Sequence, residues 1–509
     1  MHPILRHDCF PLGCAIIVSA LLFFSFFPLM YVSIDEHQYY KNSILLQRGE
    51  LKSADPLVYC GGTFKGEDYL SSYHIGKSVA LIPFTWLPFP FVMLAGLFIH
   101  LLNTGIFALI LRKLRLSPWF VMLFAFYPAF IWGSRTLFSE TTALTFLLVG
   151  TWIYLHEKPQ TKLFAGFFFG LAALVRHEAV LLALAFGIAI VWKERHTLRE
   201  PLKSPIVWFV IGGAISAALL LGWNNWYGGN PLTTQIGNPA NLFATFPRPL
   251  FLNNLVNFFA ILCIAFPLLI FALLKPFRLR LELIIASIFT LFLFAQTTNI
   301  SVYPFISPLT ITARMRYLIP LAGLLLIAYA HALQPITQRF AQRIGKTKWV
   351  TVLVLFVILI VGAIALHSQH QSLLDKRTAV RNQILTAIPD NAHAIGSSDD
   401  CIYFLPQLSG KRTYSKVDDP AQSLNQLQKR LETPIYVVAL QYTNQSDSSI
   451  RQDVIDRERM AIVNFVKAHE NELQVVYSTK DPHSLTIYHF NHQINPIVDQ
   501  TISKEKKNE

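Results

Sequence analysis

Long apolar runs alternate with short polar stretches along most of this chain. An α-helix needs about 20 apolar residues to cross a bilayer. Runs of about this length lie near residues 9–31, 91–111, 117–134, 138–155, 205–226, 253–274, 281–298, 317–334 and 349–367. A longer run at 163–192 is interrupted by Arg176, His177 and Glu178, so we expect two compact spans there that meet at a partly submerged turn. The pattern predicts a polytopic α-helical membrane protein with about eleven spans.

The pattern changes near residue 369. Apolar runs shorten to strand length, as in "IYVVAL", "LQVVYS" and "SLTIYHF", with polar, helix-like stretches between them. About 140 residues are enough for a separate hydrophobic core. We therefore expect a transmembrane domain at 1–368 and a soluble α/β domain at 369–509.

The composition agrees with a membrane protein. Of the 509 residues, 53% are hydrophobic and only 14% are charged, which is too little polar surface for a soluble protein of this size. The net charge of +13 would fit nucleic-acid binding, but basic residues gather in the short loops 112–115, 193–203, 275–280 and 339–348. Cytoplasmic loops have this basic excess. We therefore expect no nucleic-acid partner, a cytoplasmic N-terminus and an extracytoplasmic C-terminus.

The five cysteines are too few and too scattered for a metal site or a disulfide framework. Cys60 and Cys401 both fall in segments that we place outside the cell membrane, where a disulfide could form. The sequence does not supply the geometry that would decide whether they pair.

Two acids follow directly after the first apolar run, in "SIDEHQYY" at 33–40. Asp35 and Glu36 are adjacent, so their side chains point in different directions on a helix or a strand. We expect one acid to react and the other to orient or bind. A carboxylate that is partly removed from water has a raised pKa, which suits it to accept a proton from a hydroxyl or an amine. The alternative is a solvated loop start.

Basic residues at the outer edges of the spans depart from the positive-inside pattern. They are Lys77, Arg135, Arg176, Arg314 and Arg316. A cation beside hydrocarbon is costly unless an anion meets it, and guanidinium groups bind phosphate oxygens with forked donors. We expect a phosphate-binding surface at the outer face.

Each of these cations also has a structural alternative. Arg176 could form a buried pair with Glu178 or Glu140. Arg314 and Arg316 could extend to lipid headgroups.

A base and a phosphate site on one face suggest group transfer from a lipid-linked phosphate. The acceptor would lose its proton to the base as it attacks, and the cations would stabilise the departing phosphate. We expect no cofactor and no histidine metal site, because no second ligand lies at the required spacing. Asp35 with Glu36 could still bind a divalent cation.

Six segments in chain order carry a resemblance to a known family. They are "SIDEHQYY", "YHIGKSVALIPF", "SRTLFSETTALTFLLVGTWIYL", "GFFFGLAALVRHEAVLL", "NNWYGGNPLTT" and "ARMRYLIPLAGLLL". Over residues 10–367 the chain resembles integral membrane glycosyltransferases of the C superfamily, most of all bacterial relatives of protein mannosyltransferases and of lipid A aminoarabinose transferases. The resemblance implies a polyprenyl-phosphate sugar donor, a catalytic acid in the first outer loop (33–78) and a soluble outer C-terminal domain. It also implies a bacterial inner (plasma) membrane, with the active site on the periplasmic side.

Carried onto this chain, the resemblance makes Asp35 the base and Glu36 its supporting acid. The donor-phosphate residues would be Lys77, Arg176 and one or both of Arg314 and Arg316. The candidates for binding substrate are His74, Arg135, Glu140, His177, Glu178 and Tyr227. The family commonly has a proline where this chain has His177, so the roles of His177 and Glu178 stay open. Tyr227 could stack on a sugar or belong to an interfacial aromatic belt.

We therefore expect an enzyme that transfers one sugar from polyprenyl phosphate to a lipid, polysaccharide or protein acceptor on the outer face. Two other functions stay open. A transporter or flippase of lipid-linked sugars tends to have polar residues at mid-membrane depth and paired broken helices. An oligosaccharide polymerase or ligase usually has its site in a large, late outer loop. The sequence identifies neither the sugar nor the acceptor.

Overall fold

The fold is built from helices in its first part and from a mixed sheet with helices in its second. The computed structural model describes residues 3–52, 62–65, 68–71, 73–195, 200, 203–229, 251–266, 269–297, 316–344, 357, 360–364, 366–367, 370–404, 412–416, 433–441, 452–481 and 484–490. The chain divides into two compact units at Thr378 and Ala379.

The first unit is a bundle of helices. They are α1 (Pro3–Ser25), α2 (Ile34–Arg48), α3 (Ile75–Leu81), α4 (Leu94–Lys113), α5 (Val121–Phe126), α6 (Pro128–Ser134), α7 (Ser139–Tyr154), α8 (Thr161–Val175), α9 (Ala179–Lys193), α10 (Pro205–Gly228), α12 (Phe251–Ala265), α13 (Leu269–Leu274), α14 (Arg280–Thr297) and α16 (Ile319–Ile344). Short 3₁₀ turns lie at Ile82–Phe84, Phe91–Met93, Pro118–Phe120 and Arg316–Leu318, and a π-helical turn at His370–Asp375.

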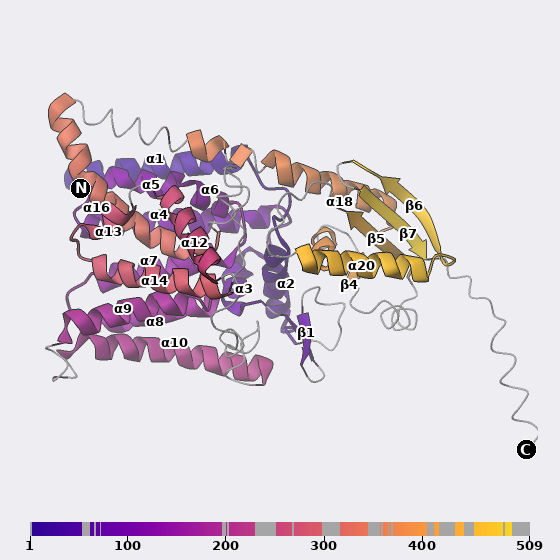
Figure 1. Cartoon of the computed structure of the whole chain (residues 1–509), viewed down its shortest axis with the longest axis horizontal. Helices are drawn as coiled ribbons and strands as arrows, with labels where there is room; N and C mark the ends of the chain where they lie inside the picture. Colours follow the sequence, from indigo (N-terminus) through magenta and orange to yellow (C-terminus); the bar gives the residue numbers. More distant parts are fainter. Residues whose placement is uncertain are drawn as a thin grey trace, which may run out of the picture. The chain divides into compact units, whose positions relative to one another are not determined.

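The long helices of this bundle run side by side, whereas α2 has a different direction. Figure 1 shows α7, α8, α9, α10 and α14 packed along one another, with α2 lying across their direction at one end of the bundle. An antiparallel hairpin of β1 (Gly62–Lys65) and β2 (Asp68–Ser71) leads from α2 toward α3. The segments at this end of the bundle hold most of the predicted site residues.

Among the described residues, three helical segments are long and apolar enough to cross a membrane: Phe91–Lys113, Pro205–Gly228 and Arg316–Arg339. The pair α6 and α7, bent by 113°, would add a fourth. Shorter apolar helices include α8, α9 and α12. The count of about eleven spans and the orientation of the chain stay predictions, and the run at 349–367 lies mostly outside the described residues.

Prolines divide or shorten two of the predicted spans. The run at 117–134 is split between α5 and α6, because Pro128 lacks an N–H group and its neighbour Tyr127 is extended (φ −62°, ψ 126°). α1 ends at Ser25, before Pro28, rather than near residue 31. The interrupted run at 163–192 does form two helices, α8 and α9, with 176–178 as their turn.

Two glycines let α8 and α10 pack backbone to backbone. A Cβ atom on Gly212 would lie 1.9 Å from the carbonyl oxygen of Leu163, and one on Gly166 would lie 2.0 Å from the carbonyl oxygen of Phe209. No larger residue fits at either position without moving a helix. Close helix packing through small residues is typical of membrane bundles.

The second unit contains a five-stranded mixed sheet in the order β4-β3-β5-β7-β6. Its elements are α18 (Lys376–Ala387, which begins at the end of the first unit), β3 (His393–Gly396), a 3₁₀ turn (Ser398–Tyr403), β4 (Thr413–Lys416), β5 (Ile435–Gln441), α20 (Gln452–Ala468), β6 (Leu473–Thr479) and β7 (Ser484–Phe490). β3 pairs in parallel with β4 and β5, whereas β7 is antiparallel to β5 and β6. The three strands expected from the sequence are β5, β6 and β7.

One cysteine of the second unit is oxidised. Cys401 is buried and disulfide-bonded. Cys60, the partner suggested by the sequence, lies outside the described residues. Cys9, Cys14 and Cys263 are free thiols.

The glycine contact between α8 and α10 predicts a position-specific loss of stability. Gly212→Ala should lower the free energy of unfolding by about 1–3 kcal/mol, because the new methyl group overlaps a backbone carbonyl. Gly222→Ala on the same helix is the control, since a Cβ there meets nothing within 4 Å. That control should be neutral or stabilising by about 0.5–1 kcal/mol. Thermal melting in detergent measures both, and equal melting of the two variants would contradict the packing.

Candidate functional site

A capping box fixes the start of α2. The Ser33 hydroxyl accepts a hydrogen bond from the Asp35 N–H group (3.2 Å), and the Glu36 carboxylate accepts from the N–H group of Ser33 (3.0 Å). Glu36 also accepts from the N–H groups of Val32 (2.5 Å) and Leu137 (2.8 Å). The carboxylate therefore ties α2 to the segment that precedes α7.

Glu36 is fully buried, and its two oxygens are occupied by backbone donors. Burial raises the pKa of Glu36 to about 7, although the N–H groups of Leu137, Val32 and Ser33 and the charge of Arg316 act in the opposite direction. With both oxygens engaged by N–H groups, Glu36 holds the backbone in place.

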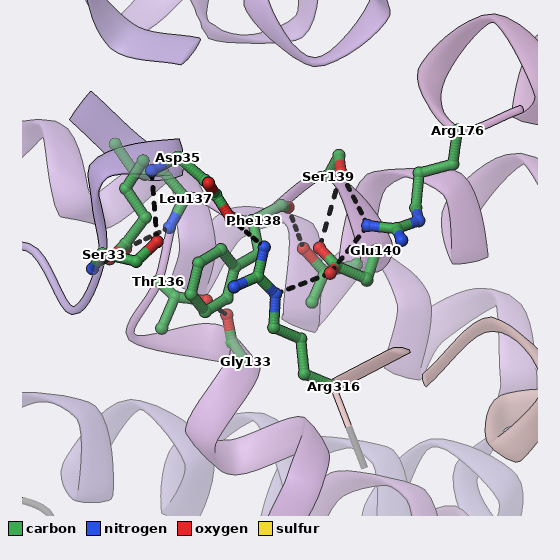
Figure 2. A network of polar contacts seen from close by, with 12 residues as sticks. Ser33, Asp35, Gly133, Thr136, Leu137, Phe138, Ser139, Glu140, Arg176 and Arg316 are labelled. Atoms are coloured by element: carbon green, nitrogen blue, oxygen red, sulfur yellow. Dashed lines mark hydrogen bonds and ion pairs between the residues drawn. The ribbon is translucent and has the colours of Figure 1, made fainter. Parts of the chain in front are cut away.

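Asp35 belongs to a chain of charges that joins four helix ends. One oxygen of Asp35 pairs with the guanidinium group of Arg316, and the other accepts a hydrogen bond from the Tyr73 hydroxyl (3.0 Å). Arg316 also donates through Nε to Glu140 (2.7 Å), and Arg176 donates through Nη1 to the same oxygen of Glu140 (2.7 Å). Figure 2 shows both guanidinium groups directed at Glu140.

The fold brings these four residues together at helix termini. Asp35 and Glu140 lie in the first turns of α2 and α7, Arg176 follows α8, and Arg316 precedes α16. Carboxylates are favoured at helix N-termini. Two positive and two negative groups balance one another, which offsets the cost of burying them.

Both arginines have further contacts that fix their orientation. The second amino group of Arg176 donates to Glu178 (2.9 Å). The guanidinium carbon of Arg316 lies 3.7 Å from the centre of the Phe138 ring, a cation–π contact. The side chains of Arg176 and Arg316 are 9% and 14% exposed. Arg316 is thus the more accessible of the two cations.

Lys77 lies close to this network but is only partly satisfied. Its ammonium group is fully buried and donates to the Thr142 hydroxyl on α7 (3.0 Å). An ammonium group has three donors, and Thr142 is its one acceptor among the described residues. Burial lowers the pKa of Lys77 to about 7, although Glu140 and Glu36 act to raise it. An anion placed here would gain hydrogen bonds and restore the charge.

His74 and His177 connect α3 to the turn between α8 and α9. Their ring centres are 4.1 Å apart, and the rings meet edge to face. Burial, followed by the charge of His177, lowers the pKa of His74 to about 3, so His74 is neutral at ordinary pH. Among the described residues, no group of three His, Cys, Asp or Glu side chains is arranged to hold a metal ion.

The predicted substrate residue Arg135 lies outside the Asp35–Arg316–Glu140–Arg176 network. It is buried, donates through Nε to the Phe26 carbonyl (2.6 Å), and lies 3.1 Å from Nδ1 of His370. Arg377 likewise donates hydrogen bonds, to the carbonyl groups of Tyr31 (2.9 Å) and Val32 (2.6 Å). Buried carbonyl groups need donors. These two arginines therefore hold the backbone that leads into the capping box.

Tyr227, another predicted residue, also lies apart from the network. The Tyr227 hydroxyl accepts a hydrogen bond from the Ser71 N–H group (2.8 Å), and its ring stacks on Trp223 at 5.5 Å. Tyr227 therefore positions the end of β2. Arg314 lies outside the described residues.

The sequence reading missed three hydroxyl side chains that complete the network: Tyr73, Ser139 and Thr142. The Ser139 hydroxyl accepts from the Tyr39 hydroxyl (3.0 Å) and from Arg176 (3.3 Å), and it lies 3.4 Å from Glu140. Ser139 and Thr142 belong to "SETTALT", where hydroxyl groups interrupt an otherwise apolar helix. This cluster of hydroxyl groups is the feature of the sequence from which Ser139 and Thr142 could have been identified.

No protein-family model and no curated protein sequence match this chain. Among solved structures, ArnT from Cupriavidus metallidurans bound to undecaprenyl phosphate is similar over 94% of this chain and 97% of ArnT, with a TM-score of 0.53 and 14% identity. The apo state of the same protein gives a TM-score of 0.48 at 14% identity, over the same shares. The arabinofuranosyltransferase AftD from Mycobacteria gives a TM-score of 0.45 at 13% identity, over 94% of this chain and 40% of AftD.

The similarity to ArnT covers nearly the whole of both chains. At 14% identity it concerns the fold alone. The likeness in fold that six short segments of the sequence led us to expect is thus confirmed: this chain has the fold of ArnT.

Proposed function

We propose that this protein is a glycosyltransferase that moves one sugar from a polyprenyl-phosphate donor to an acceptor at the outer face of the membrane. The observation that carries the proposal is the contact of a partly exposed carboxylate, Asp35, with Arg316, which is tied through Glu140 to Arg176. This contact places the proposed base, Asp35, next to a cation that can bind an anion, Arg316. The fold of ArnT, a protein solved with undecaprenyl phosphate, supports the same donor class.

We assign the donor phosphate to Arg316 and Lys77. Arg316 is more exposed than Arg176. The ammonium group of Lys77 has three N–H donors, of which one is used by Thr142 among the described residues. Arg176 gives its donors to Glu140, Glu178 and Ser139, so its role is to hold Glu140 and, through it, Arg316. A phosphate oxygen would compete with Asp35 for the same guanidinium group.

This competition sets the order of the steps in the reaction. When the phosphate takes Arg316, the Asp35 carboxylate is released and accepts the proton of the acceptor's hydroxyl or amine. The acceptor atom bonds to the anomeric carbon as the bond between that carbon and the phosphate oxygen breaks. The electron pair leaves with the lipid phosphate, which Arg316 and Lys77 stabilise. The donor therefore binds before the base is free.

The position of the charges favours surface chemistry over passage through the membrane. The Asp35–Glu140 network lies at helix termini. A second ion pair, between the exposed Lys193 and the buried Glu282 (2.7 Å), lies at the opposite ends of the helices, where the Tyr154 hydroxyl also contacts Glu282 (2.6 Å). A flippase, the alternative function, tends to have such groups at mid-membrane depth. The disulfide at Cys401 supports an oxidising, extracytoplasmic location for the second unit.

Asp35→Asn should abolish transfer but preserve the protein. The amide keeps the volume of the side chain but cannot accept a proton, so the transfer rate should fall by roughly 10²–10⁴-fold. The melting temperature should stay close to that of the wild type, and the affinity for undecaprenyl phosphate should rise, because the neutral amide no longer competes with the phosphate for Arg316. Transfer at the wild-type rate in reconstituted membranes would remove Asp35 from the mechanism.

Glu36→Gln should instead destabilise the protein. The glutamine amide nitrogen has no lone pair for the N–H groups of Val32 and Ser33, so unfolding should become easier by about 1–3 kcal/mol. Transfer should fall in step with the loss of folded protein. A variant that melts like the wild type but transfers no sugar would show that Glu36, too, takes part in the reaction.

Donor affinity should weaken as the pH rises through the pKa of Lys77. The lysine is charged below pH 7 and becomes neutral above it, so an anion binds more weakly at high pH. Between pH 6 and pH 8.5 the KM for a glycosylated lipid phosphate, a diester of constant charge, should rise roughly tenfold. Lys77→Gln should have the higher KM at both pH values. If the KM of Lys77→Gln rose with pH by the same factor as that of the wild type, the titrating group would not be Lys77.

A further inference from the structure

One face of α2 carries a row of polar side chains. Asp35, Gln38 and Asn42 are three and four residues apart and therefore share a face of the helix. Gln38 and Asn42 are 0% and 1% exposed. Asp35 accepts from the Tyr73 hydroxyl (3.0 Å), and the Asn42 amide donates to the Ser71 hydroxyl (2.9 Å). This face therefore packs against the segment that leads into α3.

The N-terminal part of α3 carries a matching row. His74 caps the helix, and Lys77 and Ser78 follow at three and four residues, so all three share a face. All three are buried, and α2 and α3 are in contact. The charge of Glu36 on α2 acts on Lys77. We call the group of buried polar side chains that Gln38, Asn42, Ser71, His74 and Ser78 supply from α2, β2 and the start of α3 the α2–α3 seam.

Several polar atoms of the α2–α3 seam have no hydrogen-bond partner among the described residues. They are both amide atoms of Gln38, Oδ1 of Asn42, Nδ1 of His74 and Oγ of Ser78. A buried polar atom without a partner costs about 1–3 kcal/mol. Apolar side chains would pack this region at no such cost, so the unpaired groups need a functional explanation.

The chemistry of these groups fits a sugar ring. Amide, imidazole and hydroxyl groups supply both donors and acceptors and carry no net charge, as recognition of neutral hydroxyl groups requires. Along the chain, the α2–α3 seam adjoins both parts of the proposed reaction: Asp35 is one helical turn before Gln38, and Lys77 directly precedes Ser78. From Asp35 to Asn42 the helix rises about 10 Å, enough for a monosaccharide.

We propose that the α2–α3 seam is the subsite for the sugar of the lipid-linked donor, with Gln38, Asn42 and His74 as the residues that determine which sugar is accepted. This inference rests on the proposed function and deepens it. The seam is closed in the unliganded protein, and it parts as the sugar hydroxyls take up the unpaired groups. A site built to bond particular hydroxyls discriminates strongly against sugars that lack them.

Lipid binding by the full-length protein in nanodiscs tests the inference. The probes are bare undecaprenyl phosphate and undecaprenyl phosphates that carry glucose, mannose, arabinose or 4-amino-arabinose. Wild-type protein should bind one glycosylated lipid at least tenfold more tightly than the other three. Gln38→Leu should reduce this preference to about twofold and leave the affinity for bare undecaprenyl phosphate unchanged. The variant should fold well, because leucine removes two unpaired polar atoms from a buried position.

The control is Gln47→Leu, the same change at an exposed position of α2, which should keep the preference of the wild type. If Gln38→Leu also keeps that preference, or if wild-type protein binds the four glycosylated lipids equally, the inference is overturned while the phosphate site stands. If wild-type protein binds none of the five lipids, the proposed function fails and the seam inference falls with it.

Discussion

The site depends on one buried carboxylate shared by two arginines. Glu140 has no exposed surface, and one of its oxygens accepts from both Arg176 and Arg316. Without that negative charge, the buried guanidinium groups would lose the carboxylate between them and keep only Glu178 and Asp35 as ionic partners among the described residues, at a cost of several kcal/mol. Glu140 therefore decides where Arg316 can lie, and Arg316 in turn contacts Asp35. The charge pattern joins α2, α7, α8 and the segment before α16 into one structure.

A second layer of backbone contacts holds the start of α2, where Asp35 lies. Glu36 accepts from two N–H groups at the start of α2 and from one in the segment before α7. Arg135 and Arg377 donate to carbonyl groups that precede α2. The two adjacent acids thus have separate tasks. Glu36 is engaged with the main chain, whereas Asp35 contacts the side chains of Arg316 and Tyr73. This division explains why the sequence has two neighbouring carboxylates at the end of its first apolar run.

Part of this arrangement can be predicted from the sequence. Charged residues in the middle of an apolar run indicate the turn between α8 and α9, and apolar runs of strand length predict β5, β6 and β7. Ser33 and Glu36 also form the S-x-x-E signature of a capping box, from which the role of Glu36 could have been inferred. The segment order implied a shared site for Asp35, Glu140, Arg176 and Arg316.

The individual partnerships could not be predicted, because local periodicity contains no information about contacts between distant segments. Asp35 and Arg316 are 281 positions apart, and Glu140 and Arg316 are 176 apart. Arg135 illustrates the same limit: its place at the outer end of a helix suggested phosphate, but the nearby acceptor is the carbonyl of Phe26. The unpaired atoms of the α2–α3 seam become visible only when every neighbour is known.

A structure of the protein with bound undecaprenyl phosphate tests the central claim most directly, because it locates the anion relative to the acid. The account predicts phosphate oxygens within hydrogen-bonding distance of Arg316 and Lys77, with the carboxylate of Asp35 no longer paired to Arg316. A phosphate bound at the opposite helix ends, near Lys193 and Glu282, with the Asp35–Arg316 pair intact, would contradict it.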